Sequence, residues 1–110
     1  MTQPPDDFLR FLEEQRRDYR IGLPQKLDEM ERLAALIGRD PTVDLAGLER
    51  LAHSMAGSGG TFGYEDLGNA AKALEMSVQR LKDSGAGATA EQAEEVRRAL
   101  AELKTRLPSA

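Results

Sequence analysis

The chain has 110 residues, of which 40% are hydrophobic and 31% are charged, so we expect one globular domain, residues 1–110. A net charge of -4, with two tyrosines, three phenylalanines and no tryptophan, argues against nucleic-acid binding. The lack of cysteine excludes disulfides and thiolate chemistry, and the lack of a long apolar run or a basic leader predicts a cytoplasmic protein without a membrane span.

The first predicted helix covers about residues 6–20 and begins with two aspartates, whose charges suit the positive end of a helix dipole. Pro24 would remove a backbone hydrogen bond from any helix that ran through it. We therefore expect the chain to restart near Gly22. The N-terminal helix would then pack as a separate arm against a bundle of residues 23–107.

Four amphipathic helices are predicted next, because apolar residues recur three and four positions apart over residues 23–37, 45–55, 67–81 and 93–103. Thr89–Gln92 is typical of a capping box at the start of the last one. The predicted buried positions are Leu23, Leu27, Met30, Leu33, Ala34, Ile37, Leu45, Leu48, Leu51, Ala52, Met55, Leu67, Ala70, Ala71, Leu74, Val78, Leu81, Ala93, Val96, Leu100 and Leu103. We predict an all-α fold, an antiparallel four-helix bundle with the additional N-terminal helix.

His53 is the only histidine in the chain. On a helical projection of 100° per residue it points away from the apolar arc, between Ala46 on one side and Gly57 and Gly60 on the other, so we expect an exposed ring. Each glycine in a helix costs about 1 kcal/mol relative to alanine. Three within four residues, with Gly59 between the other two, suggest that another protein approaches closely here, although they could also simply end the helix.

Other chemistries fit the sequence less well. The glycines follow a helix and lack both the dinucleotide-loop spacing and a Walker lysine. A metal at His53 would have only carboxylates as further ligands, which makes zinc a poor fit. No serine lies in a nucleophile elbow. We therefore expect neither a metal nor a cofactor.

The segment from Ala52 to Gly63 reads AHSMAGSGGTFG, and Leu67 and the pair Leu74-Glu75 follow it. This pattern resembles the signature of the histidine-containing phosphotransfer (HPt) domain family of bacterial phosphorelays. That signature is A-H-x-L-K-G-S and a small residue, then a glycine ten residues after the histidine, then L and L-E. The motif spans about a quarter of the chain, and the helix order extends the likeness to nearly all of it.

The resemblance implies a phosphocarrier rather than an enzyme. His53 Nε2 would accept a phosphoryl group from a receiver-domain aspartate, or from a histidine kinase system, and pass it to another receiver. Its partners would be response-regulator receiver domains, with a hybrid histidine kinase as a further candidate, and the receiver would supply Mg²⁺ and an acidic pocket. Glu75 would bind the ring Nδ1 and fix the tautomer, although it could equally be an ordinary exposed glutamate.

One residue departs from the family pattern: Ala56 stands where a lysine is usual. Arg50 and Lys72 are candidates to replace that cation, and together with Ala56, Gly57 and Gly60 they form the predicted partner-docking surface. The departure also leaves open an HPt-like adaptor or antagonist that binds receiver or kinase domains without transfer. A bundle built only for dimerisation would need an exposed apolar stripe, which the sequence pattern does not indicate, so we expect a monomer.

Overall fold

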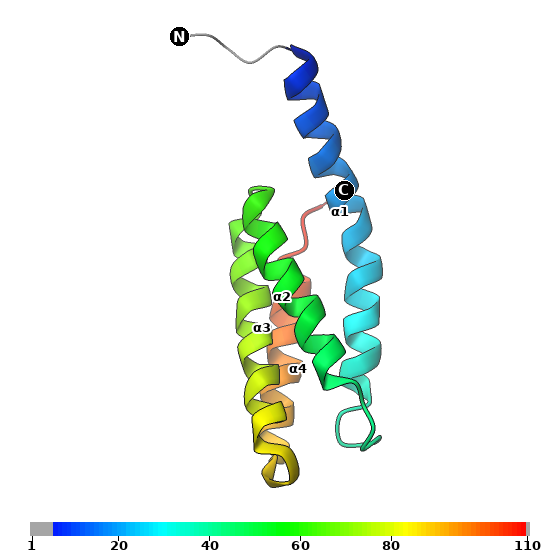
Figure 1. The fold of residues 1–110 in the computed structure, drawn as a ribbon, viewed down its shortest axis with the longest axis vertical. Coiled ribbons are helices and arrows are strands. Elements are labelled where there is room, and N and C mark those ends of the chain that lie inside the picture. The colour runs from blue at the N-terminus through cyan, green and yellow to red at the C-terminus, as the bar shows by residue number, and fades with distance from the viewer. Residues whose placement is uncertain (1–5, 110) are drawn as a thin grey trace.

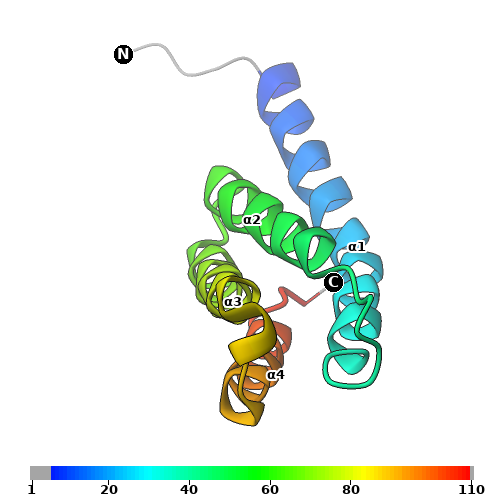
Figure 2. The same cartoon turned by 60° about the horizontal axis from the view of Figure 1, so that its bottom comes forward.

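A computed structural model describes residues 6–109, which are helical and contain no strand. The helices are α1 (Asp6–Ala35), α2 (Leu45–Thr61), α3 (Glu65–Ser84) and α4 (Ala90–Thr105), with a short 3-10 turn at Gly85–Gly87. Consecutive helices run in opposite directions (Figure 1), and seen obliquely from below they surround a shared interior (Figure 2). The prediction of an all-α fold is confirmed.

α1 is one continuous helix of 30 residues, so the predicted restart near Gly22 and the separate N-terminal helix at about residues 6–20 are wrong. Pro24 lies inside α1, where it removes the backbone hydrogen bond to the carbonyl four residues earlier. The helix passes through this defect because Leu23 and Leu27, on either side of the proline, are almost fully buried. Tertiary packing thus outweighs the local preference of proline.

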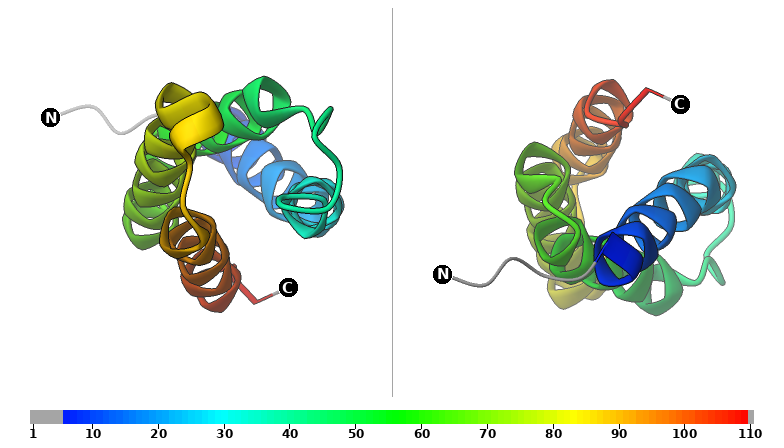
Figure 3. Two further views of the ribbon diagram at one scale, coloured as in Figure 1. Left: turned by 90° about the horizontal axis from the view of Figure 1, so that it is seen from below. Right: turned by 90° about the horizontal axis from the view of Figure 1, so that it is seen from above.

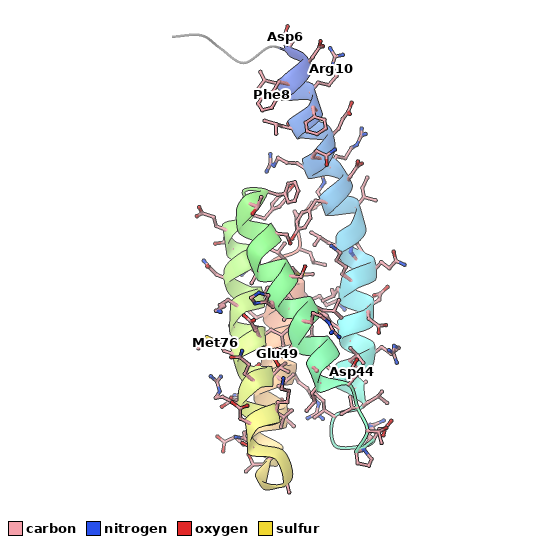
Figure 4. The ribbon with its side chains drawn as sticks, in the orientation of Figure 1. Asp6, Phe8, Arg10, Asp44, Glu49 and Met76 are labelled. Carbon is pink, nitrogen blue, oxygen red and sulfur yellow. The ribbon has the colours of Figure 1, made fainter. Side chains whose placement is uncertain are left out.

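The first half of α1, residues 6–22, extends past the other helices and is called the arm (Figure 1). Seen from above, it crosses over α2 (Figure 3, right). The Tyr19 hydroxyl lies 2.8 Å from Ser58 Oγ, and its ring stacks on Phe62 with the centroids 4.6 Å apart. Nearer the free end, where Figure 4 labels Phe8, the exposed apolar side chains are Phe8, Leu9, Phe11 and Leu12. We expected the apolar residues of this segment to pack against the bundle, but these four side chains are exposed. The monomer therefore remains a prediction.

The core lies between the four helices, and within residues 6–109 it contains nineteen buried apolar side chains, each of which belongs to a predicted stripe. Of the predicted positions, only Leu45 and Leu51 are half-buried instead. The predicted capping box is confirmed, because Thr89 Oγ1 accepts from the Gln92 backbone N–H and the Gln92 side chain accepts from that of Thr89. The helical faces were therefore assigned correctly, which places the histidine of α2 on the outside.

The α2 and α3 backbones approach each other closely at a pair of glycines. α2 continues through the glycine cluster to Thr61, so Gly59 is helical rather than part of a loop. A Cβ atom at Gly59 would lie 3.0 Å from the Gly68 backbone nitrogen, and one at Gly68 would lie 3.0 Å from the Ala56 carbonyl oxygen. Only glycine fits such an approach without displacing backbone. This contact brings the side chains of α3 within reach of those of α2.

Candidate functional site

His53 lies midway along α2 with 73% of its side chain exposed, as the helical projection predicted. Its Nδ1 atom is 2.5 Å from Oε2 of Glu75 on α3. Within residues 6–109, the other ring nitrogen, Nε2, has no hydrogen-bond partner. The two ring nitrogens therefore have distinct environments, one held against α3 and one free.

Glu75 is buried, with 5% of its side chain exposed, whereas the sequence had left open an ordinary exposed glutamate. Its second oxygen, Oε1, accepts a hydrogen bond of 3.1 Å from Nζ of Lys72. Burial alone would raise the pKa of Glu75, but the hydrogen bonds from Lys72 and His53 outweigh it and hold the pKa below its usual value. The carboxylate is therefore ionised at neutral pH.

The charge of Glu75 determines the tautomer of the imidazole. An ionised carboxylate can only accept hydrogen bonds, so the Nδ1 that contacts it must carry a hydrogen. In the neutral ring, the lone pair is then on Nε2, the exposed nitrogen. A carboxylate behind a histidine orients the ring and fixes its tautomer, as it does for metal-binding histidines. The arrangement thus presents a nucleophilic nitrogen to solvent.

Two shallow hollows lie along the α2–α3 seam, one on each side of this pair. The first, of about 410 Å³, is lined by Ala46, Glu49, Arg50, His53, Glu75, Gln79 and Lys82. The second, of about 390 Å³, is lined by Ala56, Gly60, Glu65, Gly68, Asn69 and Lys72. The predicted residues are thus divided, with Arg50 in the first hollow and Ala56, Gly60 and Lys72 in the second.

The glycines beside His53 differ in what surrounds them. Gly59 is buried and is explained by the contact with Gly68. Gly57 and Gly60 are exposed, and a Cβ atom at either would meet nothing within 4 Å. Internal packing therefore explains only one of the three glycines on which the docking prediction rested, and leaves the two outer ones as bare helix surface.

The sequence interpretation missed a charged cluster in the first hollow. Glu49, labelled in Figure 4, accepts hydrogen bonds from Lys82 Nζ at 2.6 Å and from Gln79 Nε2 at 3.1 Å. These bonds, that from Lys82 above all, lower the pKa of Glu49. Glu49 lies one turn before His53 on α2, and Gln79 lies one turn after Glu75 on α3. Because the two helices are antiparallel, pairing His53 with Glu75 would have predicted that Glu49 lies near Gln79.

In residues 6–109 no three or more His, Asp or Glu side chains are grouped so that they could hold a metal ion. Among the same residues, no helix combines the length and the apolar character that crossing a membrane requires.

Comparison with known protein families gives a match to the Hpt domain over residues 8–106, which covers all of the helices except the first two residues of α1 and includes both members of the histidine–glutamate pair. The chain belongs to the Hpt domain family. Searches of curated proteins and of solved structures gave no match. Hpt domains are phosphocarriers that act in histidine phosphotransfer within two-component systems, where they interact with receiver domains and kinases. Histidine phosphotransfer is therefore the functional class of this Hpt domain.

Proposed function

We propose that this protein carries a phosphoryl group on Nε2 of His53 between aspartates of receiver domains. The observation that carries the proposal is the pairing of the only histidine, exposed on α2, with the buried and ionised carboxylate of Glu75. Neutral imidazole is a nucleophile near neutral pH, and phosphoryl transfer depends mainly on positioning and on charge neutralisation.

The transfer follows from this geometry. The Nε2 lone pair of His53 attacks the phosphorus of an aspartyl phosphate, an N–P bond forms, and the P–O bond to the aspartate breaks to release its carboxylate. The ring keeps its hydrogen on Nδ1, so it gains positive charge as the N–P bond forms. Glu75, 2.5 Å from Nδ1, stabilises that charge. The reverse sequence passes the phosphoryl group to the next receiver, which supplies Mg²⁺ and an acidic pocket.

The surface around His53 suits a partner that must approach closely. Gly57 and Gly60 are open on the same face of α2 as His53, four and seven positions after it. Each costs about 1 kcal/mol of helix stability relative to alanine, without any internal contact that requires glycine. We assign them, with Ala56 beside them and Arg50 on the opposite side of the ring, to the surface on which a receiver docks.

The test is to incubate the full chain with phosphorylated receiver domains of its source organism and to measure acid-labile, alkali-stable label on it. We expect label on the wild type and none on His53→Gln, since the chain has no second histidine. Wild-type protein that stays unlabelled with every receiver would overturn the proposal. Binding of a receiver without label would support instead an adaptor or antagonist, the alternative that Ala56 favours.

A further inference from the structure

Lys72 is the cation attached to the His53–Glu75 pair. Its Nζ binds Oε1 of Glu75 at 3.1 Å, while Oε2 of the same carboxylate binds Nδ1 of His53 at 2.5 Å. The lysine side chain is nevertheless 60% exposed, so its ammonium group is accessible from outside. One buried carboxylate thus joins a lysine of α3 to the nucleophile of α2.

The register of the helices places Lys72 opposite Ala56. The two helices run antiparallel, so one turn forward from His53 on α2, to Ala56, corresponds to one turn back from Glu75 on α3, to Lys72. Both residues line the second hollow. Since alanine has no side chain beyond Cβ, that hollow leaves room for the lysine to change its position.

We propose that Lys72 turns from Glu75 to the phosphoryl group once His53 carries it, and that it is the positioning cation of the phosphorylated state. This inference rests on the proposed phosphotransfer function. A phosphoryl group near neutral pH has a charge of about -1.5 to -2 and three acceptor oxygens, so it attracts an ammonium more strongly than one carboxylate does. Lysine suits this movement, because its charge is compact and its four-carbon stem is flexible.

Two other cations line the hollow on the opposite side of His53. Lys82 binds Glu49 at 2.6 Å, and its release would leave that carboxylate with only the Gln79 amide, whereas Glu75 keeps the Nδ1–H of His53 when Lys72 moves. Arg50 also lies there, and within residues 6–109 it has no ion-pair partner and no hydrogen bond to Glu75. Lys72 alone of the three binds the carboxylate that holds the imidazole. Arg50 is therefore the competitor that an experiment must separate from it.

The test compares Lys72→Met, which keeps the length but removes the charge, with Lys72→Arg, Arg50→Met and Lys82→Met in the full chain. Phosphoramidate, a small-molecule donor, loads His53, and phosphorus NMR follows the phosphohistidine through a pH titration. We expect Lys72→Met alone to raise the midpoint for ionisation of the phosphoryl group, because a neighbouring cation favours the dianion. We also expect it to slow transfer from a phosphorylated receiver about tenfold, as the loss of one partly exposed charge contact does.

A second variant separates charge from structure. Ala56→Lys, added to Lys72→Met, returns an ammonium to the same hollow from α2, and we expect it to restore both the midpoint and most of the transfer rate. An unchanged midpoint and rate in Lys72→Met, or the larger effect in Arg50→Met, would overturn the assignment of Lys72. If phosphoramidate labels the wild type but no phosphorylated receiver does, the proposed function is refuted. The ionisation midpoint of the phosphoryl group would still decide whether Lys72 contacts it.

Discussion

Replacement of Gly59 by alanine should destabilise the protein, whereas the same replacement at Gly57, two residues earlier in α2, should stabilise it. Both changes gain about 1 kcal/mol in helix propensity. The new methyl group at Gly57 meets open space, but at Gly59 it would lie 3.0 Å from a backbone nitrogen and 3.1 Å from the Cα of Gly68. Overpacking against such a rigid neighbour costs about 1–3 kcal/mol.

The expected free energies of unfolding follow directly. Gly57→Ala should gain about 1 kcal/mol, and Gly59→Ala should lose up to about 2 kcal/mol after its own propensity gain is subtracted. Because the propensity contribution is common to both, the difference between the variants isolates the cost of pushing α2 from α3. For a domain of this size, about 1 kcal/mol corresponds to a change of about 4 °C in Tm.

The measurement is urea denaturation followed by far-UV circular dichroism, with wild type and both variants under identical conditions. Gly68→Ala is a check from the opposite helix, since its Cβ atom would lie 3.0 Å from the carbonyl oxygen of Ala56. Equal stabilisation by Gly57→Ala and Gly59→Ala would refute the close approach of the two helices at the glycine pair, and with it our reason for the placement of Glu75.

Three further outcomes are expected. Gly60→Trp should abolish transfer from a receiver while circular dichroism stays unchanged, because its Cβ points into open space; full activity would contradict docking at Gly60. Glu75→Ala should shift the His53 ring hydrogen away from Nδ1, as nitrogen NMR of the neutral ring would report, and an unchanged tautomer would remove Glu75 from the site. The lowered pKa of Glu75 means that its charge stabilises the fold above its unfolded pKa, and that this contribution is lost as pH falls through the lower folded pKa. Wild type should accordingly lose more stability than Glu75→Gln between about pH 6 and pH 3, and parallel losses would contradict this linkage.

The exposed position of His53 could be predicted because apolar periodicity defines the face of a helix, and all nineteen apolar residues that are buried in the described part of the chain follow that periodicity. The course of α1 could not be predicted from its own residues. Pro24 favours a break locally, and the burial of Leu23 and Leu27 against other helices, which keeps the helix continuous, is a property of the tertiary fold.

The burial of Glu75 was missed for a related reason. Its position on α3 lies beside the apolar stripe, and it is covered only because Gly59 and Gly68 allow α2 to come close. The bond between Glu49 and Lys82 likewise depends on the register of two helices, which hydropathy along one helix does not encode. Sequence patterns thus predicted the elements and their faces well, and the contacts between elements less completely.

The glycine pair also limits the positions in which His53 of α2 can face α3. Interlocked backbones resist sliding by a fraction of a turn, so the next arrangement available to α2 and α3 is displaced by a whole turn, about 5.4 Å. Such a shift would set His53 against Lys72 or Gln79, neither of which offers a carboxylate. Close packing at the glycine pair thus favours the one register in which His53 faces a carboxylate. The pairing of His53 with Glu75 therefore depends on a backbone contact that lies more than one helical turn away from either residue.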